Sequence, residues 1–209
     1  MSKISIAGAT TGTGTFTLAS PATNTDRTLT LPDEAGTVLT TAGVPASAMP
    51  AGSVLQVVST TKTDTFSASM ASGAVTDITG LAASITPTST SSKILVMVDV
   101  SATHNAGGSG FVVTRGGTPI SVGDAGGSRT RISFGGATTD DASAENHIVN
   151  NSAQILDEPA TASSVTYQVQ IYNSRVSTQT HYVNQSALDP NNSYSPRTAS
   201  RITLMEIAG

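Results

Sequence analysis

The sequence of 209 residues contains no cysteine and no tryptophan, and it carries few charges. Without cysteine the chain forms no disulfide, no zinc–thiolate or iron–sulfur site, and has no thiol nucleophile. Charged side chains, 10 basic and 14 acidic, make up 11% of the residues, whereas an average soluble domain has about 25%. The surface must therefore take most of its polarity from uncharged groups.

The charge balance argues against a nucleic acid partner, and the absence of long apolar runs argues against a membrane span. The formal net charge is −4 and the basic residues are scattered, whereas phosphate binding needs clustered lysine and arginine. No run approaches the roughly 18 apolar residues of a membrane span, and residues 1–6 lack the apolar stretch of a secretory signal. We expect no nucleic acid partner, no membrane insertion, and synthesis as a soluble cytoplasmic product.

Threonine and serine are abundant instead, with 33 and 28 copies. Threonine is β-branched, which favours pleated strands over helices. The mean hydropathy of +0.02 and the 37% of hydrophobic residues distinguish the chain from a disordered one and provide material for a core. The composition therefore predicts an all-β protein.

The first 48 residues are predicted to form an extended arm of very short strands. Alternating runs at 16–18, 29–31 and 37–40 are separated by proline, asparagine and aspartate turn signals. Strands this short cannot bury a core, so the arm needs partner chains or a docking surface. A flexible N-terminal arm is the alternative.

Residues 49–52, in a stretch rich in proline, glycine and alanine, are predicted to form a hinge between the arm, 1–48, and a C-terminal head, 53–209. In the head, period-2 and fully apolar runs recur between turns, without an amphipathic helix. This pattern fits a β-sandwich or jelly-roll-like fold. The predicted strands are Ser53 to Thr60, Asp64 to Met70, Val75 to Ile78, Lys93 to Val100, Gly110 to Arg115, Pro119 to Val122, Arg129 to Phe134, Asn146 to Leu156, Ser164 to Tyr172, His181 to Asn184 and Ser200 to Ile207.

Two runs support the strand pattern in detail. The pair Gly116-Gly117 between two extended runs predicts a tight hairpin with positive φ. Residues 165–172 alternate so that one face is apolar and the other is polar, as in a half-buried strand. Since only 4% of residues are aromatic, one copy buries little, and we expect a homotrimer or another closed oligomer to cover the remaining apolar faces.

Residues that could carry chemistry are few. His104, His147 and His181 lie far apart, none at a recognised metal spacing, and no serine occurs in a Gly-x-Ser-x-Gly motif. Paired carboxylates for glycoside hydrolysis would have to come together in space. We therefore expect no metal, no cofactor and no catalytic site.

Asp124, Arg129 and Arg131 form a small charged group in residues 123–132. If this segment is a strand, the two arginines point to the same face. They are interpreted either as exposed edge charges that discourage strand addition or as an ion-pair site at a subunit interface.

The segment 184–196 is rich in amide, hydroxyl and aromatic groups. Such residues suit recognition of polar surfaces through stacking and adaptable hydrogen bonds. An ordinary solvated hairpin loop is the alternative. The predicted contact residues are Asn184, Asp189, Asn191, Asn192 and Tyr194.

Residues 16–41, FTLASPATNTDRTLTLPDEAGTVLTT, resemble the N-terminal motif of tailed-bacteriophage fibre proteins, with Pro-Ala-Thr-Asn and Thr-Leu-Thr-Leu-Pro-Asp before a Gly-Thr-Val strand. The remainder, from 52–58 through 80–87 to 199–207, is similar to the distal β-domain of tail-fibre proteins of marine and cyanobacterial phages. Segments 123–131 and 156–160 add to this likeness. The match spans nearly the whole chain, although its motifs carry structure and no chemistry.

The resemblance implies a non-enzymatic virion protein, a homotrimeric fibre whose head adsorbs to the host surface. Its partners are then further copies of itself, other tail or capsid proteins, and a host cell-surface glycan or protein. A capsid-decorating or head-fibre protein without a receptor role is an alternative, and a polysaccharide depolymerase is a weaker one. The arm residues expected to attach to the virion are Phe16, Leu18, Leu29, Leu31, Val38 and Leu39.

Overall fold

A computed structural model describes residues 11–15, 22, 24–26, 28, 44, 46–104, 108–136 and 147–209. The chain divides into two units, Met1–Leu39 and Thr40–Gly209. The boundaries predicted at residues 48 and 53 stay a prediction. The strands predicted at 16–18, 29–31 and 37–40, and all six predicted attachment residues, lie outside the described residues: Phe16, Leu18, Leu29, Leu31, Val38 and Leu39.

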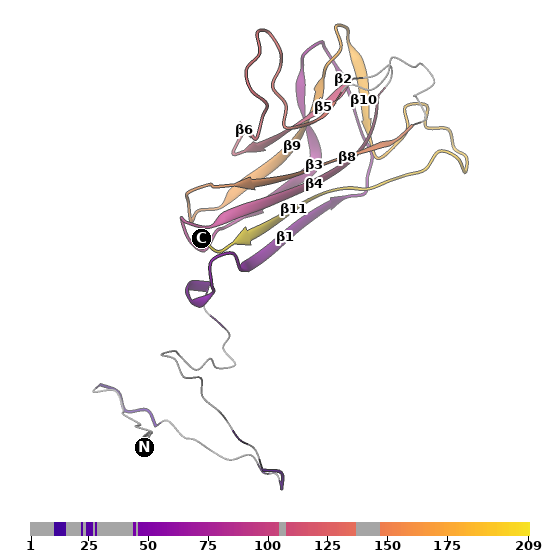
Figure 1. The fold of residues 1–209 in the computed structure, drawn as a ribbon. Coiled ribbons are helices and arrows are strands. Elements are labelled where there is room, and N and C mark those ends of the chain that lie inside the picture. The colour runs from indigo at the N-terminus through magenta and orange to yellow at the C-terminus, as the bar shows by residue number, and fades with distance from the viewer. Residues whose placement is uncertain are drawn as a thin grey trace. The chain divides into compact units, whose positions relative to one another are not determined.

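The second unit is built from strands paired antiparallel, which confirms the all-β prediction (Figure 1). Over the described ranges, no helix has the length and apolar character to cross a membrane. The elements are the 3-10 helix η1 (Ala46–Ala48) and the strands β1 (Val54–Lys62), β2 (Phe66–Met70), β3 (Val75–Ile85), β4 (Lys93–His104), β5 (Ser109–Arg115), β6 (Thr118–Ile120), β7 (Phe134–Gly136), β8 (Val149–Asp157), β9 (Val165–Asn173), β10 (Gln179–Val183) and β11 (Ser200–Ile207).

The strands form two sheets that pack as a β-sandwich. Sheet A has the order β1-β11-β4-β10-β2, and β8 pairs with the other edge of β4. Along their shared edge of β4, β11 pairs with residues 93–99 and β10 with residues 102–104. Sheet B has the order β3-β9-β5-β6, with β7 also paired to β5.

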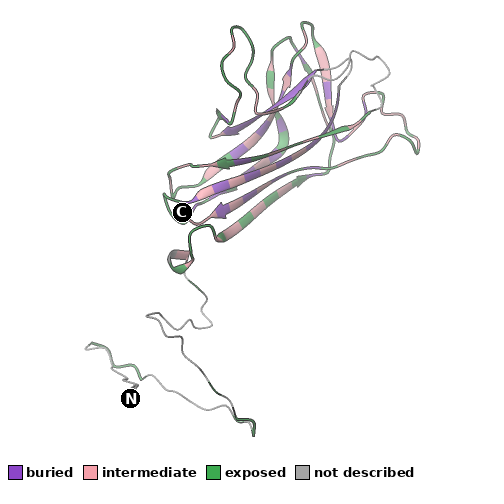
Figure 2. Ribbon diagram, viewed as in Figure 1, coloured by how far each residue is buried: buried purple, intermediate pink, exposed green. Residues whose placement is uncertain are grey.

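The core lies between the two sheets and comes from alternate residues of each strand. In β4, Ile94, Val96 and Val98 are at most 1% exposed, while the residues between them are half-buried. Figure 2 shows this alternation along the strands of the sandwich. In β9 the buried residues are Tyr167, Val169 and Ile171, as the period-2 pattern of 165–172 predicted.

The hairpin between β5 and β6 confirms the Gly116-Gly117 prediction, because these glycines have φ values of 55° and 84°. The predicted strand Arg129 to Phe134 is wrong. Most of it belongs to the loop 121–133, and the strand β7 begins only at Phe134. The loop closes on itself through hydrogen bonds from Gly123 N to Ile132 O (3.2 Å) and from Arg129 N to Gly126 O (3.3 Å), which replace sheet pairing.

Strand β3 is longer than predicted because it continues past an irregularity. Its register to β9 shifts between Asp77 and Ala82, which pair with Gln170 and Gln168. The shift frees carbonyl groups of β3 from the ladder, and the side-chain amide of Gln168 donates to two of them, Ile78 O (3.1 Å) and Leu81 O (3.2 Å). A side chain of β9 thus provides hydrogen-bond donors for two carbonyl groups of the bulge.

Glu206 in β11 is a fully buried carboxylate on the inner face. Its oxygens accept hydrogen bonds from Gln56 Nε2 (2.6 Å) and from the backbone N and the Oγ1 of Thr88 (both 2.7 Å). Burial by itself raises the pKa of this carboxyl, but the hydrogen bonds outweigh it and hold the pKa below its usual 4.5. Glu206 therefore ties β1 and the β3–β4 connection to β11 in its ionised form.

We expect Glu206→Gln to lower the free energy of unfolding at pH 7 by about 1–3 kcal/mol, because an amide nitrogen would then face the donors. Since the folded-state pKa is depressed, the carboxylate stabilises the fold above about pH 4.5 and loses this effect as the pH falls through the folded-state pKa. Urea unfolding at pH 7 and pH 3 should show the difference from wild type shrinking in acid. An undiminished difference, or one that the exposed Glu158→Gln reproduces, would contradict this role.

Candidate functional site

The two ends of the sandwich differ in what they carry. At one end, called the loop end, β1 finishes beside the start of β11 (Lys62 opposite Ser200), and the loops 174–178 and 184–199 leave the sheets. At the other end, called the linker end, Gly52 N donates to Ala208 O (2.8 Å) and Ala208 N donates to Ser53 O (2.8 Å). In Figure 1 the C-terminus lies beside the start of β1. The chain thus enters and leaves the sandwich away from its longest described loop.

Asn184 opens the loop 184–199 and is not exposed. Its amide donates to the carbonyls of Lys62 and Asp64 (both 2.9 Å), and its Oδ1 accepts from Ser200 Oγ (2.7 Å). It takes a left-handed conformation (φ 63°), which asparagine tolerates better than most residues. Asn184 holds three segments together at the loop end, so its prediction as a contact residue is wrong.

Hydrogen bonds within the loop 184–199 give it a defined shape. Both carboxylate oxygens of Asp189 accept from the guanidinium of Arg197, and Asp189 N donates to Ser186 Oγ (3.1 Å). The hydrogen bond from Arg197 holds the pKa of Asp189 below its usual value. Asn192 Oδ1 accepts from Tyr194 N (3.2 Å). Asp189 and Asn192 therefore serve the loop's own conformation.

Tyr194, Asn191 and Leu188 are among the groups that this loop exposes to solvent. Tyr194 is 78% exposed and Leu188 is 58% exposed, and Asn191 is exposed as well. Two of the five predicted contact residues, Asn191 and Tyr194, are thus fully available to a ligand. Leu188 and the role of Arg197 were not predicted from the sequence, although the spacing of Asp189 and Arg197 across a polar loop could have suggested an ion pair.

Asp124, Arg129 and Arg131 are exposed in the loop 121–133. The side chain of Arg129 donates to Gly126 O (3.1 Å) and that of Arg131 to Gly123 O, both within the same loop. The three residues do not lie on a strand, so the argument from strand alternation fails. In this loop the arginines hold their own backbone, and an ion pair to another subunit stays a prediction.

A second polar group joins the two sheets near the linker end. Asp157 in β8 accepts from Arg115 Nη1 (2.9 Å to each oxygen) and from Tyr167 Oη (2.7 Å). Arg115 and Tyr167 are register partners in sheet B, whereas Asp157 belongs to sheet A. Burial, together with the hydrogen bond to Asp157, raises the pKa of Tyr167. These hydrogen bonds connect the two sheets. The spacing of the three residues in the sequence did not predict this contact.

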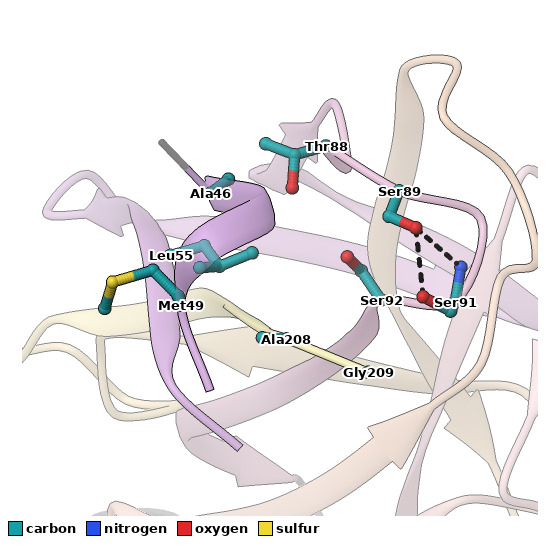
Figure 3. Close-up of a pocket in the computed structure, with 9 residues that line it drawn as sticks. All are labelled: Ala46, Met49, Leu55, Thr88, Ser89, Ser91, Ser92, Ala208 and Gly209. Atoms are coloured by element: carbon teal, nitrogen blue, oxygen red, sulfur yellow. Dashed lines mark hydrogen bonds between the residues drawn. The ribbon is translucent and has the colours of Figure 1, made fainter. Parts of the chain in front are cut away.

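A pocket of about 300 Å³ lies at the linker end, between η1, β1, the β3–β4 connection and the C-terminus (Figure 3). Ser89 Oγ bonds to both Oγ and N of Ser91 at its rim (3.0 and 3.1 Å). Thr88, which holds Glu206, also lines it. Its surface consists of hydroxyls and small apolar groups: Ala46, Met49, Leu55, Thr88, Ser89, Ser91, Ser92, Ala208 and Gly209.

Of the three histidines, His147 and His181 have described side chains, and the side chain of His104 lies outside the described residues. His181 is fully buried, and its Nδ1 lies 2.8 Å from Ser109 Oγ. His147 is exposed, and Thr103 Oγ1 donates to its backbone carbonyl (3.0 Å). In the ranges that the structure describes, no group of three histidine, cysteine, aspartate or glutamate side chains is placed to hold a metal ion.

Neither a protein-family model nor a curated protein matches this chain.

Asn184→Ala should lower the free energy of unfolding by about 3 kcal/mol, because it leaves buried backbone groups without partners and places alanine at positive φ. Asn191→Ala, which removes an exposed side chain of the same loop, should change it by less than about 0.5 kcal/mol. Chemical denaturation of both variants provides the comparison. Equal stabilities would contradict the structural role of Asn184.

Proposed function

We propose that this chain is a non-enzymatic bacteriophage virion protein, a trimeric fibre that attaches to the particle through its N-terminal arm and presents the loop end of its sandwich to the host surface. The observation that carries the proposal is that the two ends of the sandwich differ. The residues that precede β1 join it at the linker end, while Leu188 and Tyr194 are exposed on the loop at the opposite end. The resemblance of residues 16–41 to phage fibre proteins supports the same orientation.

The strand pairing supports a jelly-roll-like head. The pairs β1 with β11, β3 with β9, β4 with β8 and β5 with β6 are nested, as when one long hairpin is folded over into two sheets. Such a fold keeps the two chain ends of the domain together and leaves the opposite end free for loops. It suits a head mounted on a shaft.

The exposed groups of the loop 184–199 suit a polar ligand with apolar patches, such as a cell-surface glycan or a protein. Tyr194 offers a ring for stacking and Asn191 offers an amide, and the Asp189–Arg197 pair fixes the loop beneath them. Contacts of this size are weak individually. Three copies on one fibre would raise them to useful avidity.

Two alternatives lead to different results. A capsid-decorating or head-fibre protein would share the architecture without binding a receptor. A depolymerase would release new reducing ends from host polysaccharide, and the purified chain can be assayed for this directly.

Antibodies raised against the full chain should label the tail fibres of phage particles in immunogold electron microscopy. Particles labelled with antibodies against an unrelated host protein serve as the control. Gold on the capsid would favour the head-fibre alternative, and particles without label would contradict a virion location.

Purified wild-type chain should compete with the phage for adsorption to host cells, and Tyr194→Ala should compete severalfold less well because it removes the exposed ring. Thr90→Ala is the matched control, since Thr90 is exposed on the β3–β4 connection, at the linker end. The measurement is the adsorption rate at increasing protein concentration. Full competition by Tyr194→Ala would remove this loop from the receptor site.

A further inference from the structure

The outer face of sheet A, which points away from sheet B, carries an apolar row across four strands. Cross-strand register places Val57 of β1 opposite Met205 of β11, Met205 opposite Leu95 of β4, and Leu95 opposite Leu156 of β8. Val57 is 54% exposed and Leu156 is 57% exposed, while Leu95 and Met205 are half-buried. We call these four residues the apolar row. An aliphatic row of this length on a solvent face marks an interaction surface.

A polar row runs parallel to the apolar row, and each of its members lies four residues away from the apolar residue on the same strand. Here Thr61 lies opposite Arg201, Arg201 opposite Asp99, and Asp99 opposite Ser152. Arg201 and Asp99 are adjacent and of opposite sign, yet in the described structure neither side chain forms a hydrogen bond or an ion pair. Both charges are therefore available to a partner.

We infer that this face is the interface between copies of the chain in the proposed homotrimer, on which the inference rests. The occupant is a second copy because the face complements itself. If the copies are related by a rotation axis that runs parallel to the strands, each residue lies at the same level along the axis in every copy. The apolar row of one copy then meets the apolar row of the next, and Arg201 of one copy meets Asp99 of the next. Like copies then meet without repulsion, and both charges gain a partner.

The two ends of the apolar row fit a ring. A cyclic trimer is built from heterologous contacts, in which one side of each copy meets the other side of its neighbour. Val57 and Leu156, the most exposed residues of the row, lie on the two outer strands of this four-strand region, β1 and β8. In the ring the β1 side of one copy packs on the β8 side of the next. A shallow depression lined by Met97, Asp99, Ser152 and Gln154 adjoins this contact.

Disulfide cross-linking tests the interface directly, because the natural chain has no cysteine. Within one copy, positions 57 and 156 are separated by three strand spacings, about 14 Å, whereas a disulfide needs Cα atoms within about 7 Å. Oxidation of full-length Val57→Cys/Leu156→Cys should therefore give covalent dimers and trimers in a denaturing gel. Leu156→Cys/Val176→Cys, which moves one cysteine to an exposed valine in the loop 174–178, should not form trimers.

A charge substitution gives an independent readout. Leu156→Glu places an acidic group in each contact without touching the core, so the variant should sediment as a folded monomer with unchanged far-ultraviolet circular dichroism. Val176→Glu, in a loop outside the face, should remain a trimer like the wild type.

The outcomes separate this inference from the proposed function. A trimeric wild type that neither cross-links through positions 57 and 156 nor dissociates with Leu156→Glu would overturn the interface and leave the fibre intact. A monomeric wild type would overturn the homotrimer and the interface together. Cross-linked trimers with the first cysteine pair and none with the second would support the assignment.

Discussion

The sandwich depends on β4, which is paired along both edges and carries apolar residues on both faces. One edge holds β11 and then β10, the other holds β8, so a single strand organises sheet A. Its inward residues, Ile94 to Val100 in alternation, fill the core. Its outward residues include Leu95 and Met97, which are half-buried on the face that points away from sheet B. In the proposed homotrimer, neighbouring copies would cover these outward apolar residues of β4.

The chain stabilises its loops with buried amides and a buried carboxylate, because it has few charges and no disulfide. Asn173 donates to the carbonyls of Met70, Ala71 and Ser177, and Asn184 performs the same task for the neighbouring connection. At the opposite end, Glu206 gathers donors from two segments. Each of these buried side chains has hydrogen-bond partners, so its burial costs little free energy, and its removal would leave those partners unsatisfied and lower the stability.

Three surfaces of the sandwich differ in the side chains that they expose. The linker end joins the preceding chain and encloses a small hydroxyl-lined pocket. The loop end exposes Tyr194 and Leu188 on a loop fixed by the Asp189–Arg197 pair. The outer face of sheet A carries the apolar row and, four residues further along each strand, the polar row. In the proposed fibre, attachment, recognition and association would occupy these three separate surfaces.

Most of the strands could be predicted from the sequence, because period-2 alternation and turn glycines are local properties. Residues 165–172 and Gly116-Gly117 were predicted correctly for this reason, whereas Arg129 to Phe134 was not, since its backbone bonds within a loop. Tertiary structure alone decided that Asn184 and Glu206 are buried and that Asp157 joins two sheets. It also aligned Val57, Leu95, Leu156 and Met205. These positions are far apart in the sequence, and only strand pairing determines which polar groups find partners and which apolar groups meet.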